Sequence, residues 1–361
     1  MAVLPRDIPR DTHLFKALRL APAVATVVVV LLIPYVLPTY RISQISGACV
    51  MALAVVGLNL LTGYGGQISL GHAAFFGLGA YTTGILIATY DVGWILAFGA
   101  SVVVCFVVGV LVGMPALRVR GMYLALVTLA LGVLFPSLVR RFSELTGGSL
   151  GLMGIRVDPP DIAYFGGPTA NILWQYWMTM ICLGLGCLVV WNLVRSRTGR
   201  AIVALRDNER AAIIMGVNRT LVRTTLFGVS AGIAGLAGAL FAVQTGLLTP
   251  ESFSLLVTIY FLVAMVLGGS STYWGPILGG FAIYFIPIWS SDVTGGPISG
   301  VLFGAVVIAL VFLMPSGLVG LAKSAAARFV TFSPVAPAPA EPDPSGEVAA
   351  RRRELAADRV S

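Results

Sequence analysis

Long apolar runs, separated by short polar or glycine-rich turns, set the pattern of this chain from about residue 22 to residue 320. Apolar runs of about 17–25 residues are long enough, as helices, to cross roughly 30 Å of hydrocarbon. The pattern therefore predicts an all-α integral membrane protein with about ten transmembrane helices. We place these helices near residues 22–38, 44–62, 70–90, 94–116, 122–139, 172–194, 224–246, 255–273, 276–291 and 298–316.

Basic residues predict the orientation of these helices. Residues 195–223 carry seven arginines and two acids, whereas the apolar runs on either side carry no charge. A short basic loop of this kind stays in the cytoplasm and fixes the topology. We therefore expect both termini in the cytoplasm, with an N-terminal segment 1–21, a membrane domain 22–320 and a tail 333–361. The loop 140–171 then lies outside, and the Pro/Ala-rich start of the tail predicts disorder.

The composition restricts the class of protein further. A mean hydropathy of +0.94 and 11% charged residues exclude a soluble globular domain. The net charge of +8 reflects loops close to anionic lipid and does not indicate nucleic acid binding. All four cysteines fall inside apolar runs, where packing is the expected role, so we expect no metal site and no cofactor.

The basic segment also has the pattern of a helix over residues 199–216. Thr198 can cap its start, and Gly216 can end it in a left-handed turn. Apolar contacts would come from Ile202, Leu205, Ala212, Ile213 and Met215. A helix displayed to the cytoplasm favours a docking site for another protein, and the alternative is a loop that only fixes topology.

The chain has no visible energy source of its own. The proposed spans contain no charged residue, although ion-coupled transporters need buried ionisable groups. Its two lysines, Lys16 and Lys323, do not follow a Walker A glycine pattern. Energy for uphill transport must therefore come from a partner, and the 199–216 helix is the expected contact.

A glycine-rich stretch interrupts the membrane pattern at residues 57–81 and contains a polar cluster. Its density of glycine predicts an unwound or re-entrant segment that faces a cavity. Exposed backbone and half-helix ends can hold the charged groups of a zwitterion. A tight turn with close helix packing is the alternative. The candidate solute-path residues are Gly65, Gly66, Gln67, Ser69 and His72, of which His72 lacks partners for metal binding.

Small residues recur every four positions along residues 228–238. Such a stripe lets two membrane helices approach closely, in the same chain or in another subunit. The residues expected to serve this packing are Gly228, Gly232, Gly235 and Gly238.

Five blocks of sequence carry a family resemblance. They are GLNLLTGYGGQISLGHAAFFGLGAYT at 57–82, TGGSLGLMGI at 146–155, GRAIVALRDNERAAIIMGVN at 199–218, AGIAGLAGALFA at 231–242 and VLGGSSTYWGPILGG at 266–280. In this combination the chain resembles the LivM-type permeases of branched-chain amino acid ATP-binding cassette (ABC) importers, over about residues 40–320.

The third block resembles the loop by which such permeases engage their ATPases. That loop has the pattern Glu-Ala-Ala, three residues, then Gly. Here Ala211, Ala212 and Gly216 match, but Arg210 occupies the place of the acid, with Glu209 one position earlier. The resemblance assigns ATPase coupling to Arg206, Asn208, Glu209, Ala211, Ala212 and Gly216.

The resemblance also implies partners and a fold. It implies a type II importer-like permease, a homologous second permease, two ATP-binding subunits and an extracytoplasmic substrate-binding protein. The expected function is a passive pathway for leucine, isoleucine or valine across the bacterial plasma (inner) membrane. Urea or a short amide is an alternative solute. An ion-coupled transporter, a channel or structural subunit, and a membrane enzyme are the alternatives from other classes.

Overall fold

The computed structural model describes residues 28–116, 122–161, 165, 167–294, 299–313 and 317–321. From Val29 to Lys323 the chain forms one compact unit. The expected cytoplasmic segment 1–21 and the tail 333–361 lie outside the described residues. Of the first predicted span, 22–38, the structure describes a helix at 28–36.

Helices make up nearly all of the described chain, as the apolar pattern predicts. The long ones are α2 (Thr39–Leu58), α3 (His72–Ala88), α4 (Trp94–Ala116), α5 (Met122–Arg141), α7 (Ala170–Arg195), α10 (Arg219–Thr245), α11 (Leu255–Gly268), α12 (Gly275–Thr294) and α13 (Ser299–Leu313). The short ones are α6 (Ser143–Thr146), α8 (Arg197–Asp207) and α9 (Glu209–Ile214). A π-helical turn, Asn59–Tyr64, extends α2.

Six stretches of the described residues are long and apolar enough to cross a membrane. They correspond to α2 with its π-helical turn, α4, α5, α7, α10 and α12. Helices α3, α11 and α13 are apolar but shorter. Helix α11 ends at Gly268, earlier than the predicted limit of 273, because Gly269 takes a φ of 109° that ends the helix.

Helix α10 lies at the centre of this unit and packs mainly against α4, α3 and α2. Its glycines provide the close approach that the stripe predicts. A Cβ atom at Gly238 would overlap the carbonyl oxygen of Phe76 in α3, and one at Gly235 would lie 3.1 Å from the carbonyl oxygen of Ser101 in α4. Gly228 and Gly232 also face α4. The stripe therefore packs against helices of the same chain.

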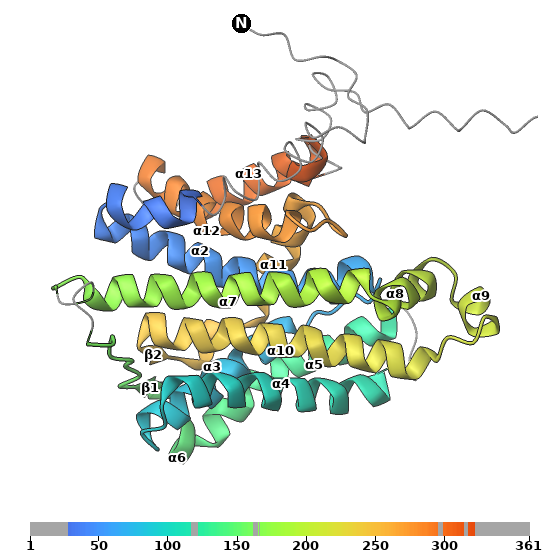
Figure 1. The fold of residues 1–361 in the computed structure, drawn as a ribbon, viewed down its shortest axis with the longest axis horizontal. Helices are drawn as coiled ribbons and strands as arrows, with labels where there is room; N and C mark the ends of the chain where they lie inside the picture. Colours follow the sequence, from blue (N-terminus) through green and yellow to red (C-terminus); the bar gives the residue numbers. More distant parts are fainter. Residues whose placement is uncertain are drawn as a thin grey trace, which may run out of the picture. The chain divides into compact units, whose positions relative to one another are not determined.

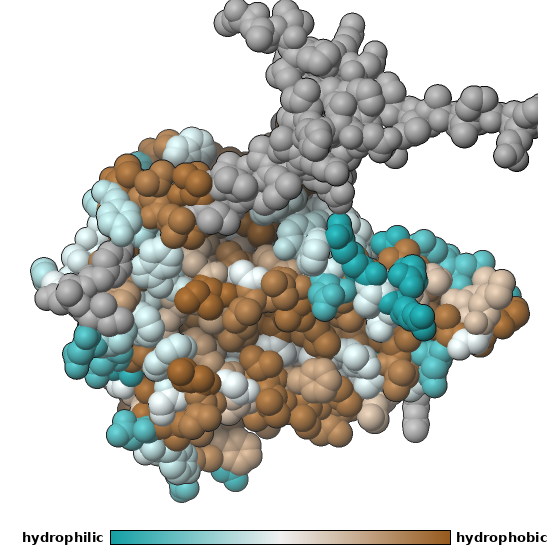
Figure 2. Space-filling model, viewed as in Figure 1, coloured by the Kyte–Doolittle hydropathy of each residue, from teal (hydrophilic) through white to brown (hydrophobic). Residues whose placement is uncertain are grey.

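The two ends of the long helices carry different small elements (Figure 1). Helices α8 and α9 lie at one end. At the other end lies α6, with two short strands, β1 (Leu152–Met153) and β2 (Leu247–Leu248), which pair antiparallel. Figure 2 shows hydrophobic residues across the middle of this face and hydrophilic residues toward its ends. This banding is typical of a protein embedded in a bilayer.

Candidate functional site

The basic segment between α7 and α10 folds as two helices, not as the single helix predicted over 199–216. Ser196, rather than Thr198, caps α8, because its hydroxyl oxygen accepts from the backbone N–H of Gly199 at 3.2 Å. At Asn208 the backbone is extended, and the Oδ1 atom of this residue accepts from the N–H of Ala211 at 3.1 Å. This second cap starts α9 and divides the segment.

Helix α9 is anchored to α10 by ion pairs. The Glu209 carboxylate lies 2.8 Å from Arg219 and 3.2 Å from Arg223. Ala212, one turn further, is buried. Gly216 then has a φ of 85°, which confirms the left-handed turn predicted there. Glu209 and Ala212 therefore hold α9 in place and leave its other face free, where Ala211 is exposed.

The exposed face of this segment carries an apolar tip of three residues, Ile213, Ile214 and Met215. Ile214 is 84% exposed and Met215 is 86% exposed, at the end of the long helices that carries α8 and α9 (Figure 1). The sequence pattern assigned Ile213 and Met215 to apolar contacts, but against the part of the chain that the structure describes Ile213 is about half exposed and Met215 is almost fully exposed. Large apolar side chains exposed together in this way are typical of surfaces that contact a protein or a membrane.

Arg206, at the end of α8, turns toward the membrane helices. Its guanidinium donates to the carbonyl oxygen of Gly63 at 3.2 Å and to the hydroxyl of Ser271 at 3.1 Å. Gly66 packs against the aliphatic part of the same side chain. The basic segment is thereby bonded to the glycine-rich break that the sequence identified.

This break, residues 59–71, is the unwound segment that the glycine density predicts. The π-helical turn ends at Tyr64, and Gly66 has a φ of 65°, a left-handed conformation that favours glycine. Thr62 donates its hydroxyl to the carbonyl oxygen of Gln67 at 2.9 Å, which closes the turn. From Gln67 to Leu70 the chain continues without regular structure until α3 begins at His72.

Two polar side chains of the break are buried without partners. Gln67 is 6% exposed and Ser69 is 1% exposed. Among the described residues, neither amide atom of Gln67 nor the hydroxyl of Ser69 has a hydrogen bond. Buried polar groups cost free energy unless water or a ligand satisfies them. These two side chains are therefore the best candidates on the break for contact with a polar solute.

His72 has a structural position. Its Nε2 atom lies 3.1 Å from the carbonyl oxygen of Ala54 in α2, and its ring meets Phe261 of α11 edge to face. Gly65 is closely packed as well, since a Cβ there would overlap Leu226 of α10. Of the five predicted path residues, the structure thus leaves Gln67 and Ser69 buried with unsatisfied polar atoms, packs Gly65 and His72, and leaves Gly66 exposed beside the Arg206 side chain.

The break also contacts α5. The backbone N–H of Leu70 donates to the hydroxyl of Thr128 at 3.0 Å, and Gly71 lies directly against the carbonyl oxygen of Thr128. This contact could not be predicted from the sequence, because a lone threonine in an apolar run usually bonds to its own helix.

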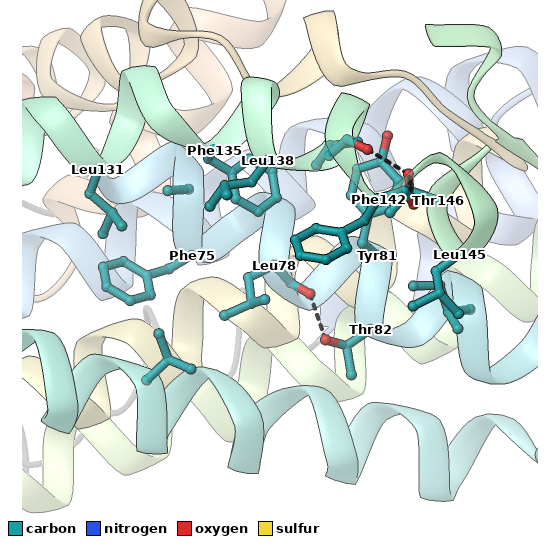
Figure 3. Close-up of a pocket in the computed structure, with 14 residues that line it drawn as sticks. Phe75, Leu78, Tyr81, Thr82, Leu131, Phe135, Leu138, Phe142, Leu145 and Thr146 are labelled. Atoms are coloured by element: carbon teal, nitrogen blue, oxygen red, sulfur yellow. Dashed lines mark hydrogen bonds between the residues drawn. The ribbon is translucent and has the colours of Figure 1, made fainter. Parts of the chain in front are cut away.

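An apolar pocket of about 460 Å³ lies between α3, α4, α5 and α6 (Figure 3). Phe75 and Leu78 of α3 face Leu131 and Phe135 of α5 across it. The hydroxyls at its edge are those of Tyr81, Thr82 and Thr146, and each already donates to a backbone carbonyl. The pocket carries no charged group for an ammonium or a carboxylate, so it does not suit the polar end of a zwitterion.

Comparison with known proteins gives consistent matches. The family model described as "Branched-chain amino acid transport system / permease component" matches residues 42–311. The permease protein LivM of a high-affinity branched-chain amino acid transport system from Salmonella typhimurium is 29% identical over 296 residues, covering 74% of this chain and 67% of the relative. The corresponding LivM of Escherichia coli K12 is 29% identical over 289 residues, with the same coverage of each chain.

A second kind of permease protein also matches. LivH of Escherichia coli K12, from a high-affinity branched-chain amino acid transport system, is 24% identical over 280 residues, covering 74% of this chain and 91% of the relative. No solved structure shows a significant match to this chain.

Proposed function

The chain belongs to the branched-chain amino acid transport permease family, and from this premise we propose that it forms the translocation pathway for leucine, isoleucine or valine in an ABC importer. It is a transport subunit and a multi-pass protein of the bacterial plasma (inner) membrane. The proposed substrate follows the names of the two LivM proteins and of LivH, which are permease proteins of high-affinity branched-chain amino acid transport systems.

The observation that carries this proposal is the exposed apolar tip at the end of α9. In the proposal, this tip is where the free energy of ATP hydrolysis is passed to the permease. Ile214 and Met215 are more than four-fifths exposed at a hydrophilic end of the molecule. Burial of exposed apolar surface against a partner is favourable. We propose that this partner is an ATP-binding subunit, which hydrolyses ATP for the permease.

The remaining partners follow from the family. LivM and LivH of Escherichia coli K12 both resemble this chain, which supports a pair of homologous permeases around one pathway. Two ATP-binding subunits and an extracytoplasmic binding protein complete the proposed importer. The permease itself has the proposed type II importer-like fold of about ten helices, with both termini in the cytoplasm.

The pathway passes the break at residues 59–71 in this proposal. Gln67 and Ser69 are the side chains that would meet the solute, since both are buried with unsatisfied polar atoms. A zwitterion that leaves water needs polar partners of this kind along its route.

The test uses the full transporter reconstituted in liposomes. Ile214→Asp places a charge in the middle of the apolar tip without touching the ion pairs of Glu209. We expect the ATP-binding subunits to stop co-purifying with the permease, and leucine uptake to fall about tenfold or more. Ile214→Val keeps the apolar surface and is the matched control. Wild-type co-purification and uptake with Ile214→Asp would contradict the proposal.

Two competing functions are separated by the same preparation. Isoleucine and valine should inhibit the uptake of labelled leucine. If the protein were a urea or amide permease, urea or acetamide would inhibit its uptake instead. Uptake should also require ATP inside the compartment that holds the ATP-binding subunits and persist when a protonophore removes the proton gradient. An ion-coupled transporter would show the opposite dependence.

A further inference from the structure

One arginine of the coupling segment connects three parts of the chain that are far apart in sequence. The Arg206 guanidinium donates to the carbonyl oxygen of Gly63, 143 residues away, and to the hydroxyl of Ser271, 65 residues away. Gly63 belongs to the break after α2, and Ser271 belongs to the break between α11 and α12. A single side chain of α8 thus contacts both interruptions of the membrane helices.

The two breaks are also bonded directly to each other. Ser271 donates its hydroxyl to the carbonyl oxygen of Gly63 at 2.7 Å. Asn59 accepts from the backbone N–H of Ser271 at 3.0 Å and donates to the carbonyl oxygen of Thr272 at 3.0 Å. A displacement of one break must therefore displace the other or break several hydrogen bonds.

The backbone at this junction is held in a conformation that it would not adopt alone. Ser271 has a φ of 58°, in the left-handed region that side chains with a Cβ rarely occupy. Such conformations persist only where the surrounding contacts impose them, and they gather at functional sites. At Ser271 the contacts are the hydrogen bonds to Asn59, Gly63 and Arg206.

Two further contacts hold the Arg206 side chain. Its Nε atom forms an ion pair with Asp207 at 2.9 Å, and Gly66 packs on its aliphatic part. Only about a third of the side chain is exposed, with 32% accessible to solvent. A planar guanidinium with several donors suits this role, because it bonds to two acceptors at once in a defined geometry.

We propose that Arg206 is a positioning residue of the transport cycle: it transmits movement of the ATPase-bound helices α8 and α9 to the two joined breaks, and so changes the position of Gln67 and Ser69. This inference rests on the proposed function. The residue faces the membrane helices of its own chain, so it acts after the ATP-binding subunit has docked and not in the docking itself.

The test measures transport and hydrolysis separately in the reconstituted complex. In Arg206→Ala we expect the ATP-binding subunits to co-purify as in the wild type and hydrolysis to continue. The number of leucine molecules transported per ATP should fall about tenfold or more, since the coupling between the sites is lost. Arg200→Ala is the matched control, because Arg200 lies on the same helix but, among the described residues, its side chain bonds only to the carbonyl oxygen of Arg195.

A second variant protects the test against misfolding. Ser271→Gly removes the hydroxyl but relieves the positive φ, so it disturbs the junction without straining the backbone. It should also lower the number of leucine molecules transported per ATP. The double variant Arg206→Ala, Ser271→Gly should transport as many per ATP as the more impaired of the two single variants, because both substitutions remove the same connection.

The outcomes distinguish this inference from the proposed function. An unchanged ratio of transport to hydrolysis in assembled Arg206→Ala, or in assembled Ser271→Gly, would overturn the positioning role. Loss of ATPase co-purification in Arg206→Ala would overturn it as well, since the residue would then act in docking. Failure of the proposed function would instead appear as intact co-purification in Ile214→Asp.

Discussion

The guanidinium of Arg140, at the end of α5, lies 2.7 Å from the carboxylate of Glu251, which is 111 residues further along the chain. Glu251 belongs to the 3-10 helix Pro250–Phe253 that precedes α11. The pair therefore fastens the end of α5 to the connection between α10 and α11. Figure 1 shows α6, which follows α5, and strand β2, which precedes this connection, at the end of the long helices opposite α8 and α9.

This pair predicts a pH dependence at that end of the protein. The hydrogen bond from Arg140 holds the pKa of the Glu251 carboxyl below its ordinary value of 4.5. Because the pKa is lowered in the folded state, the pair stabilises the folded state at pH values above the ordinary pKa. This contribution to stability is lost as the pH falls through the lowered pKa. We expect Arg140→Gln to return the midpoint of the Glu251 titration toward 4.5, as measured by NMR of labelled glutamate. An unchanged midpoint would show that the pair does not form in the membrane-embedded protein.

The buried polar groups of the break give a prediction in which two readouts move in opposite directions. Gln67→Leu removes an amide with two unsatisfied atoms, which should raise the free energy of unfolding by about 1–3 kcal/mol. If the amide meets the solute, leucine uptake per assembled complex should nevertheless fall about tenfold. Ser69→Ala should show the same pattern with smaller changes. A stabilised complex that still transports at the wild-type rate would place the path elsewhere.

The orientation of the helices can be tested by thiol labelling. The four native cysteines are buried, so their background reaction should be low. Met215→Cys, on the apolar tip, should react with an impermeant maleimide only from the cytoplasmic side. Leu150→Cys, which is 84% exposed near α6, should react only from outside. Reaction of both from the same side would refute the proposed topology between them.

The glycine packing of α10 predicts a strong effect from a single methyl group. Gly238→Ala would drive a Cβ into the carbonyl oxygen of Phe76, which costs about 1–3 kcal/mol when a packed core must shift. We expect a lower melting temperature and less folded protein in detergent. Gly184→Ala is the matched control, since among the described residues the added Cβ meets nothing within 4 Å beyond its own stretch of helix. Equal melting temperatures would mean that the α3–α10 contact is looser than the structure has it.

Periodicity and composition predicted the features that depend on local sequence. Apolar runs identified the long helices to within a few residues, and glycine density identified the break at residues 59–71. Gly216 was correctly assigned a left-handed turn. In each case the physical cause lies within one short stretch of chain, which the sequence displays directly.

Features that depend on distant residues could not be predicted in the same way. The division of the coupling segment was visible in principle, because Asn208 followed by Glu209 is a common start of a helix. The inward direction of Arg206 was not visible, since its acceptors belong to residues 63 and 271. The direction of Glu209 depended likewise on Arg219 and Arg223, which the fold brings to one face.

Close contact between α10 and its neighbours α3 and α4 has a consequence for how the protein can change shape. Helices separated by side chains can slide by exchanging rotamers, whereas helices whose backbones touch at glycine have no side chain to rearrange. Helices α3, α4 and α10 should therefore travel as one rigid body. Alternate opening of the pathway must then take place at the edges of this body, where α5 and α11 meet it.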